Sequence, residues 1–174
     1  DARPKANVLA NTAMGGGIED KEYYPNCDIE LFDIPNIHVV RDAYEKAVKT
    51  SISNDDSRFY AAIDSSGWLG LIGMVLKGAQ RMAHVMLAGH SILTHCSDGW
   101  DRTSQLTSLT MLLLDPSYRT LQGFACLIGK EWLAFGHKFQ QRHGVADFFD
   151  DFEQMSPIFV QFLDCVHQII LQHP

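Results

Sequence analysis

The sequence predicts an α/β fold in which helices flank a central sheet. Apolar residues recur at steps of three and four over several stretches, a spacing typical of amphipathic helices. Two shorter stretches, Asp28 to Val40 and Ser91 to His95, are instead rich in strand-forming residues. The second is followed at once by a polar loop and another helical pattern, and ligand sites in open sheets lie at this end of a strand.

The first part of the chain predicts loops, strands and one helix. Residues 1–27 are polar, and Gly15 to Gly17 mark a turn, so we expect a loop there. Asp28 to Val40 contains two turn signals and predicts two short strands with a bend between them. A helix is expected from Arg41 to about Lys49, and the polar run Ser51 to Ser57 indicates another loop.

A long helix is predicted next, because one apolar stripe runs through the following stretch. The stripe consists of Trp68, Leu71, Ile72, Val75, Ala79, Met82, Ala83 and Met86. Ser91 to His95 then predicts a strand, and Cys96 to Arg102 a loop. The helix after this loop should end near Asp115, because Pro116 disfavours helical dihedral angles in the residue before it.

Two more helical patterns complete the chain. The first comprises Phe124, Leu127, Ile128, Trp132 and Phe135, and closes near Gly136 or continues through Phe139. The second extends from about Pro157 to Leu171 and carries Ile158, Phe159, Phe162, Leu163, Val166 and Ile170.

The composition limits the classes of function. A chain of 174 residues with 46% hydrophobic and 20% charged residues can bury one sizeable core, which predicts a single globular unit. Its net charge of −7 argues against nucleic acid as a partner, because such proteins need a positive face. Any anionic ligand must therefore meet a local positive field.

The cysteines and the hydropathy pattern bear on the cellular compartment. The four cysteines are Cys27, Cys96, Cys126 and Cys165. Their wide spacing suggests neither a disulfide framework nor a metal site, and fits a reducing compartment. No stretch reaches the roughly 18 uncharged apolar residues of a membrane span, since Lys77 and Arg81 interrupt Trp68 to Leu93. Because the chain starts at Asp1 without a signal pattern, we expect a soluble segment of a longer protein.

The segment most informative about chemistry is His95-Cys96-Ser97-Asp98-Gly99-Trp100-Asp101-Arg102-Thr103, in which five residues separate a cysteine from an arginine. A tight loop of this length can turn successive backbone N–H groups inward, and the following helix adds the positive end of its dipole. Such a cradle suits a phosphate dianion. The sequence therefore predicts an anion-binding loop.

Cys96 and Arg102 have the chemistry of phosphoryl transfer. The guanidinium of Arg102 can hold two phosphoryl oxygens and stabilise their charge. The same positive field favours the thiolate of Cys96 and can lower its pKa from the usual value of about 8.5. A thiolate beside bound phosphorus can attack it to form a cysteinyl-phosphate, which water then hydrolyses. A buried cysteine with no catalytic role is the alternative interpretation.

The leaving alkoxide needs a proton, and the loop contains two candidate donors, Asp98 and Asp101. We prefer Asp101, which lies next to the arginine. An acid inside an anion-binding loop should have a raised pKa, which would suit it to donate a proton. The other carboxylate could orient Arg102 or accept backbone N–H bonds.

The loop resembles the active-site signature of the myotubularins, and other segments are similar to the same family in the same order. These are Asp1 to Pro4, Ala10-Asn11, Gly15 to Gly17, Asn36 to Val39, Leu114 to Pro116, Tyr118 to Thr120, Gly123-Phe124, Lys130 to Leu133, Phe135 to Phe139, Ser156 to Phe159 and Phe162 to Val166. Glu22 to Cys27 and Cys165 to Gln168 resemble the branch that also carries a FYVE finger. The resemblance covers nearly the whole chain and is weakest from Ala43 to Leu93.

The resemblance implies a cysteine-dependent phosphatase fold and a phosphoinositide 3-phosphatase. Its substrates would be phosphatidylinositol 3-phosphate and phosphatidylinositol 3,5-bisphosphate, recognised by their headgroups on endosomal membranes, with the enzyme in the cytoplasm at the membrane periphery. No cofactor or metal is implied. Some family members lack the cysteine and arginine and act as partners, which suggests homo- or hetero-oligomers formed through regions outside this chain. Because this sequence retains Cys96 and Arg102, the resemblance favours an active enzyme.

The resemblance also assigns substrate-binding residues. Ser97, Asp98, Gly99 and Trp100 would line the phosphate cradle, and Trp100 could either cover the inositol ring or belong to the core. Lys138 matches a basic position used toward a second inositol phosphate, and Arg142 lies four residues on, so the two could form a positive rim. The alternative is a solvated cationic face.

Two asparagines match family positions near the headgroup, Asn11 and Asn36. Their amides could hydrogen-bond inositol hydroxyls. Asparagines in turn-rich sequence more often make local turns, which is the competing explanation.

We expect residues 1–174 to be the central, catalytic-loop portion of a myotubularin-like phosphatase domain, with no complete second domain. Family members have a domain of pleckstrin-homology type before this region and more phosphatase domain after it. Two other functions stay open: a protein tyrosine or dual-specificity phosphatase, whose acid usually comes from a separate loop, and a non-enzymatic phosphoinositide-binding scaffold. Oxidation of the thiolate would be a by-product of the same electrostatics.

Overall fold

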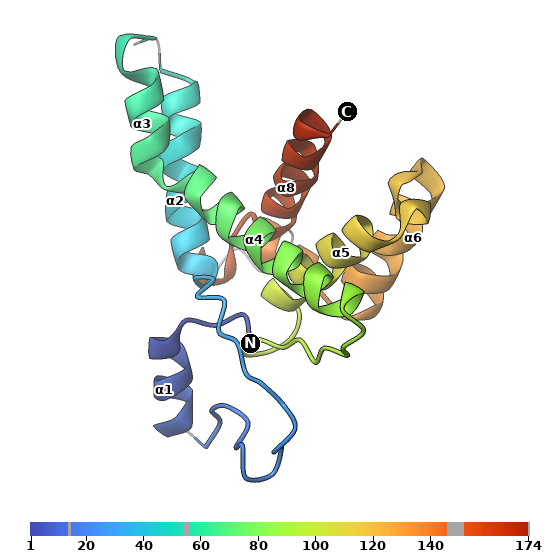
Figure 1. Ribbon diagram of the computed structural model, residues 1–174. Coiled ribbons are helices and arrows are strands. Elements are labelled where there is room, and N and C mark those ends of the chain that lie inside the picture. Colours follow the sequence, from blue (N-terminus) through green and yellow to red (C-terminus); the bar gives the residue numbers. More distant parts are fainter. Residues whose placement is uncertain (14, 54–55, 146–151, 174) are drawn as a thin grey trace.

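The computed structural model describes residues 1–13, 15–53, 56–145 and 152–173. The α-helices are α1 Lys5–Ala13, α2 Ile37–Ser51, α3 Phe59–Ser66, α4 Trp68–Leu87, α5 Arg102–Leu114, α6 Leu121–Ile128, α7 Phe139–His143 and α8 Ile158–Gln172. Short 3-10 turns lie at η1 Asp56–Arg58, η2 Pro116–Arg119 and η5 Phe152–Gln154, and a π-helical segment at η3 Gly129–Ala134. Figure 1 shows α4 running across the middle of the molecule, between α2 and α3 on one side and α5 and α6 on the other.

The predicted α/β fold with a central sheet is wrong for the described residues, which contain helices and no strand. Ser91 to His95 is extended, and the carbonyl of His95 accepts a hydrogen bond from the Ala2 amide at 2.9 Å. The carbonyl of Ala2 in turn accepts from the Ile34 amide at 2.9 Å. Three chain segments therefore lie side by side, but isolated bonds do not make the repeating ladder that defines a sheet.

The second predicted strand region is also corrected. Residues 28–36 have no regular secondary structure, and Asp33 has a φ of +53°, whereas residues 37–40 are the first turn of α2. The side chain of Asn36 accepts a hydrogen bond from the Val39 amide at 3.4 Å and caps this helix. An N-cap satisfies one of the free N–H groups at a helix start, so the apolar residues after Asn36 continue into a helix and not into a strand.

The predicted helices are confirmed where apolar periodicity was strongest. All members of the predicted α4 stripe except Met86 are buried. Gly78 also lies on this face, and a Cβ there would come 2.8 Å from Leu106 Cδ2 of α5. The absence of a side chain thus lets α4 and α5 cross closely (Figure 1). The expected loop over residues 1–27 is wrong at α1, which is helical and largely exposed.

The C-terminal helices close the core over the buried ring of Trp132. This ring packs edge-on against Phe159 at 4.9 Å and lies 4.9 Å from Phe162, both on α8. The helix α5 ends at Leu114, directly before Asp115 and Pro116, as predicted. The pattern from Phe124 to Phe135 is helical too, although it passes from α6 into the π-helical segment η3.

No single helix in the described part of the chain is long and apolar enough to cross a membrane. The pair formed by α3 and α4, which meet at a bend of 51°, reaches the required length and composition together.

Candidate active site

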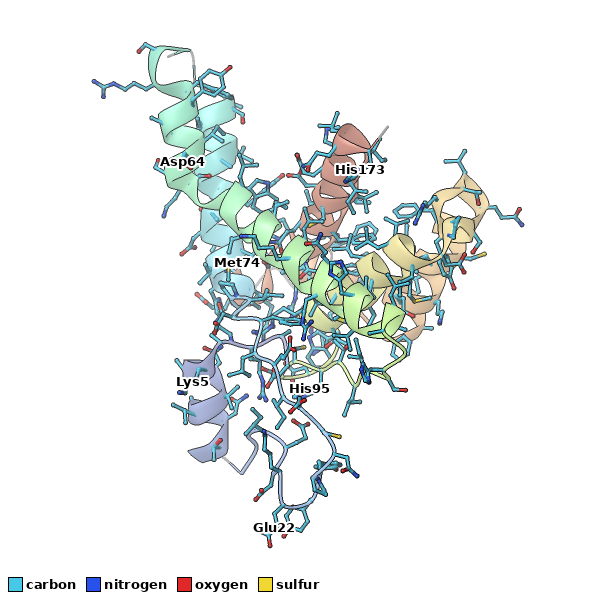
Figure 2. All side chains as sticks on the ribbon, viewed as in Figure 1. Lys5, Glu22, Asp64, Met74, His95 and His173 are labelled. Carbon is cyan, nitrogen blue, oxygen red and sulfur yellow. The ribbon has the colours of Figure 1, made fainter. Side chains whose placement is uncertain are left out.

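The loop from Cys96 to Asp101 connects the extended segment 91–95 to the first residue of α5. Figure 2 labels His95, which leads into this loop below α4. Gly99 has a φ of +91°, a conformation that side chains disfavour, and it allows the tight turn. Its amide donates a hydrogen bond to Cys96 Sγ at 3.3 Å. At least one backbone N–H therefore faces the sulfur, as an anion-binding loop requires.

The thiol of Cys96 is only 7% exposed, yet its pKa is lowered. Burial by itself would raise this pKa, since it disfavours the charged thiolate. Hydrogen-bonding groups of Thr103 and Gly99, together with the charge of Arg102, outweigh burial and favour the thiolate. The buried Thr103 hydroxyl makes no other hydrogen bond of ordinary geometry within the described residues, so it can turn toward the sulfur.

Arg102 is buried and held between the loop and the segment before α2. Its Nη2 donates to the hydroxyl of Ser97 at 3.2 Å, and its Nη1 donates to the carbonyl of Ile34 at 3.1 Å. Two fixed contacts hold the guanidinium beside the loop that begins at Cys96. This arrangement gives the loop a positive charge with a defined orientation, as a phosphate clamp needs.

Asp101 is buried, and both of its carboxylate oxygens have partners. Oδ2 lies 2.8 Å from Nη2 of Arg142, and Oδ1 lies 3.2 Å from Arg142 Nε and 3.2 Å from His137 Nδ1. Burial would raise the pKa of Asp101, but the hydrogen bonds and charges of His137 and Arg142 lower it overall. The predicted rise of this pKa is therefore not found, because the sequence argument did not include these two partners.

The predicted cradle residues differ in exposure. Ser97 and Asp98 are exposed, Gly99 and Trp100 are partly buried, and all four lie on the turn between Cys96 and Asp101. The loop thus keeps two polar side chains accessible above a buried sulfur. Their roles toward substrate stay predictions.

Lys138 and Arg142 do not form a shared positive rim. The Nζ of Lys138 lies 3.8 Å from the centroid of the Trp100 ring, a cation–π contact at the side of the loop. Arg142 is instead 5% exposed and bound to Asp101 and to Gln154, whose carbonyl accepts from Nη1 at 2.8 Å. Since α7 begins at Phe139, Lys138 precedes the helix, and the argument that placed both residues on one helical face does not apply.

The two asparagines have local roles in the structure. Asn36 caps α2, as described above, a role that the sequence did not predict. Asn11 lies in α1, and its carbonyl accepts a hydrogen bond from the Gly16 amide at 2.9 Å. Neither contact prevents an amide from meeting a headgroup, so that part of the prediction stays untested.

His137 was not among the predicted site residues, although it lies in the Phe135 to Phe139 segment that resembles the family. Its ring is fully buried, and Nδ1 lies 2.7 Å from the carbonyl oxygen of Trp100. Periodicity alone classes a histidine between aromatic residues as a core residue. Only the folded chain brings it to the loop, 37 positions earlier in the sequence.

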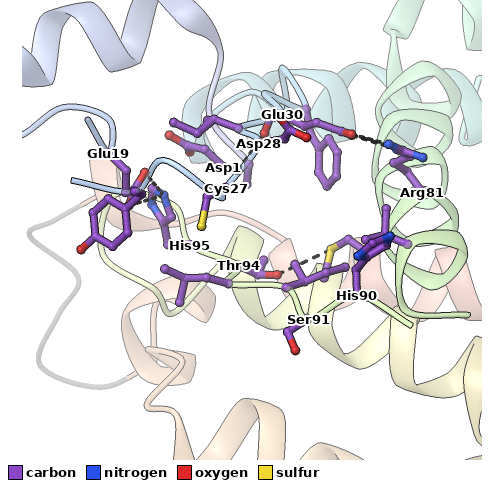
Figure 3. Close-up of a pocket in the computed structure, with 18 of the residues that line it drawn as sticks. Asp1, Glu19, Cys27, Asp28, Glu30, Arg81, His90, Ser91, Thr94 and His95 are labelled. Carbon is purple, nitrogen blue, oxygen red and sulfur yellow. Dashed lines mark hydrogen bonds and ion pairs between the residues drawn. The ribbon is translucent and has the colours of Figure 1, made fainter. Parts of the chain in front are cut away.

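A cavity of about 430 Å³ lies next to the site, between residues 19–32 and the extended segment 90–95 (Figure 3). On one side of it Glu19 Oε1 lies 3.1 Å from His95 Nε2, and on the other Glu30 forms an ion pair with Arg81. No predicted site residue lines this cavity. In the described residues, no group of three His, Cys, Asp or Glu side chains could hold a metal ion.

Comparison with known proteins identifies the family of the chain. Residues 1–174 match the family described as "Myotubularin-like phosphatase domain". The chain is 47% identical to myotubularin of Xenopus laevis, 47% to phosphatidylinositol-3,5-bisphosphate 3-phosphatase mtm-1 of Caenorhabditis elegans, and 43% to phosphatidylinositol-3,5-bisphosphate 3-phosphatase MTMR4 of Homo sapiens.

Each of these alignments includes all of this chain but only a fraction of the relative, namely 29%, 30% and 15% of their respective lengths. The similarity to the FYVE-containing branch stays a prediction. At this identity, and with the family match extending over every residue, the chain belongs to the myotubularin-like phosphatase family.

Proposed function

We propose that this chain contains the catalytic loop of a phosphoinositide 3-phosphatase that acts on phosphatidylinositol 3-phosphate and phosphatidylinositol 3,5-bisphosphate. Family membership supports the reaction class, and the names of the mtm-1 and MTMR4 relatives support the lipid. The observation that carries the proposal is the geometry of the loop: the Gly99 amide donates to the buried Cys96 sulfur at 3.3 Å, and Arg102 is held against Ser97 of the same loop at 3.2 Å. The lowered pKa of the Cys96 thiol agrees with this geometry.

The proposed reaction has two steps. The Cys96 thiolate attacks phosphorus, a sulfur–phosphorus bond forms, and the bond from phosphorus to the inositol oxygen breaks. The departing alkoxide takes a proton from a carboxylic acid. Water then attacks the cysteinyl-phosphate and releases inorganic phosphate and the thiolate. Arg102 and the loop amides stabilise the charge on the equatorial oxygens in both steps.

The proton donor remains one of two loop carboxyl groups. Asp101, our preferred donor, is ionised through its ion pair with Arg142, so it must take up a proton before it can give one. A phosphate dianion bound beside it would favour protonation through charge repulsion. Asp98 is exposed on the same loop and could exchange protons with water directly.

The cellular setting is also proposed. A lipid headgroup substrate places the enzyme at a membrane surface, and the family resemblance suggests the cytoplasmic face of endosomes. Because the chain has a net charge of −7, attraction to anionic lipid would depend on local groups such as Lys138 or on other parts of the protein. Oligomers with family members would likewise involve regions outside this chain.

The proposal is tested by phosphate release from diacyl phosphatidylinositol 3-phosphate, measured for the longest natural form of the protein that contains these residues. Cys96→Ser should reduce turnover by at least about a thousandfold, because an alcohol replaces the ionised nucleophile. Cys165→Ala is the matched control, because this second buried thiol lies in the helical core, and it should keep turnover within about twofold.

Three outcomes would contradict the proposal. Turnover that survives the loss of Cys96 would exclude a cysteinyl-phosphate. Faster cleavage of a phosphotyrosine peptide than of the lipid would indicate a protein phosphatase. Binding of lipid without any turnover in the unmodified protein would support the scaffold instead.

A further inference from the structure

The structure assigns His137 as a positioning residue that fixes the peptide bond between Trp100 and Asp101 in the anion-binding loop, an inference that rests on the proposed function. His137 reaches the loop from the turn after η3 and is not part of the loop sequence. It contacts the loop with one ring nitrogen only. This nitrogen is Nδ1, whereas Nε2 is buried away from the loop.

The contacts of His137 Nδ1 show that this atom carries a hydrogen. This atom lies 2.7 Å from the Trp100 carbonyl oxygen and 3.2 Å from Oδ1 of Asp101. A carbonyl oxygen can only accept a hydrogen bond, and the Asp101 oxygens already accept hydrogen bonds from Arg142. Nδ1 must therefore carry a hydrogen, and its shorter contact is with the carbonyl.

Aromatic neighbours hold the rest of the His137 ring in place. His137 packs edge-on against Trp132 at 4.8 Å and against Phe139 at 4.7 Å, and Nε2 is buried without a hydrogen-bond partner in the described residues. The backbone amide of His137 is also tied to the carbonyl of Trp132 at 2.9 Å. The imidazole is thus locked in place by its aromatic neighbours and presents a single donor to the loop.

The hydrogen bond from Nδ1 to the Trp100 carbonyl also orients the next backbone N–H of the loop. In a planar trans peptide the C=O and N–H groups point in opposite directions. Holding the Trp100 carbonyl toward His137 therefore aims the Asp101 N–H the opposite way, away from the aromatic core. The Ser104 hydroxyl, 3.5 Å from the same carbonyl, supports this orientation. One amide of the loop is thus oriented before any anion arrives, which avoids an ordering cost on binding.

The experiment replaces His137 with three residues that differ in where they place a donor. In His137→Asn the amide nitrogen takes the place of Nδ1, in His137→Gln it takes the place of Nε2, and His137→Phe keeps only the ring. The readout is the concentration of inorganic phosphate that half-protects Cys96 from alkylation by iodoacetamide, followed by mass spectrometry. It needs no turnover.

We expect His137→Phe to raise this concentration about tenfold, the effect of one lost hydrogen bond. His137→Gln should behave like His137→Phe, whereas His137→Asn should stay within about threefold of the unmodified protein. With phosphatidylinositol 3-phosphate, kcat should follow the same order, with a loss of about a hundredfold for His137→Phe through misplacement of the loop.

Equal protection in the Asn and Gln variants would overturn the assignment, because a role limited to packing does not distinguish the two amide positions. That comparison still decides the matter if His137→Phe does not fold. The lack of any protection in the unmodified protein would overturn it too. Failure of the proposed function appears differently, as absence of lipid turnover in the unmodified protein while phosphate protection and its dependence on residue 137 persist.

Discussion

Cys96 and Cys165 are both buried thiols, but their surroundings give them opposite acid–base behaviour. Cys96 begins the proposed anion-binding loop, where Thr103, Gly99 and Arg102 lower its pKa despite burial. Cys165 lies within α8 against α4, where burial, and secondarily the charge of Asp164, raise its pKa to about 12. Burial alone therefore makes a thiol inert, and it takes donors and a cation at close range to reverse that effect.

The same contrast applies to the groups around each thiol. Near Cys96 the chain buries Asp101, Arg102, His137 and Arg142, all with polar contacts. Around Cys165 the neighbours are mainly apolar side chains of α4 and α8. Burying charge costs stability unless it is paired, and here Arg142 pairs with Asp101 while Arg102 donates to the Ile34 carbonyl and the Ser97 hydroxyl.

The largest expected effect comes from breaking the ion pair beneath the loop. Arg142→Met should lower the free energy of unfolding by about 3 to 5 kcal/mol, because it leaves the Asp101 carboxylate buried without its main partner. Arg81→Met is the control, since this exposed arginine also pairs with a carboxylate, Glu30. Chemical denaturation should show a much smaller loss for the control. Equal losses of unfolding free energy in the two variants would mean that the buried pair contributes no more to stability than the exposed pair.

The next effect concerns the clamp. Arg102→Lys should reduce kcat toward phosphatidylinositol 3-phosphate by about a hundredfold, because an ammonium cannot hold two phosphoryl oxygens in one plane. Arg119→Lys serves as the comparison: its guanidinium donates to the carbonyls of Leu112 and Leu113 at the far end of α5. Comparable activity of the two variants in steady-state kinetics would remove Arg102 from the reaction.

The smallest effect is the alkaline stability of the α8 side. A raised thiol pKa contributes stability that is present below the unfolded value of about 8.5 and is lost as pH rises toward the folded value of about 12. The free energy of unfolding should therefore fall by about 1 to 2 kcal/mol between pH 8 and pH 10 because of Cys165. Cys165→Ala should lack this part of the decline. A parallel decline in both proteins would assign it to other groups.

Much of the helical framework could be predicted from the sequence, because burial of one helix face leaves a repeating apolar pattern. The stripe of α4 and the end of α5 before Pro116 are examples. The predicted strands were wrong because residues such as those of Ser91 to His95 favour extended backbone, whereas a sheet also needs partners for a full ladder. Sequence patterns do not specify those partners.

The candidate site was predictable only in part, for a similar reason. The loop is contiguous in the sequence and contains both Cys96 and Arg102, so the spacing of these two candidate residues could be read directly. The pKa of Asp101 depends on His137 and Arg142, which lie 36 and 41 residues further along the chain (137 − 101 and 142 − 101). Long-range contacts of this kind leave no local pattern, and the helical-face argument for Arg142 failed because α7 begins after Lys138.

The most direct test of the account is the pH dependence of alkylation at individual cysteines of the folded protein. Iodoacetamide labelling, quantified by mass spectrometry from pH 5 to pH 10, reports the thiolate of each site. Cys96 should react with a midpoint below the usual value of about 8.5, while Cys165 stays unlabelled throughout. A midpoint for Cys96 at or above that value would contradict an ionised nucleophile in this loop. So would a Cys96 that stays unlabelled over the whole pH range, as Cys165 should.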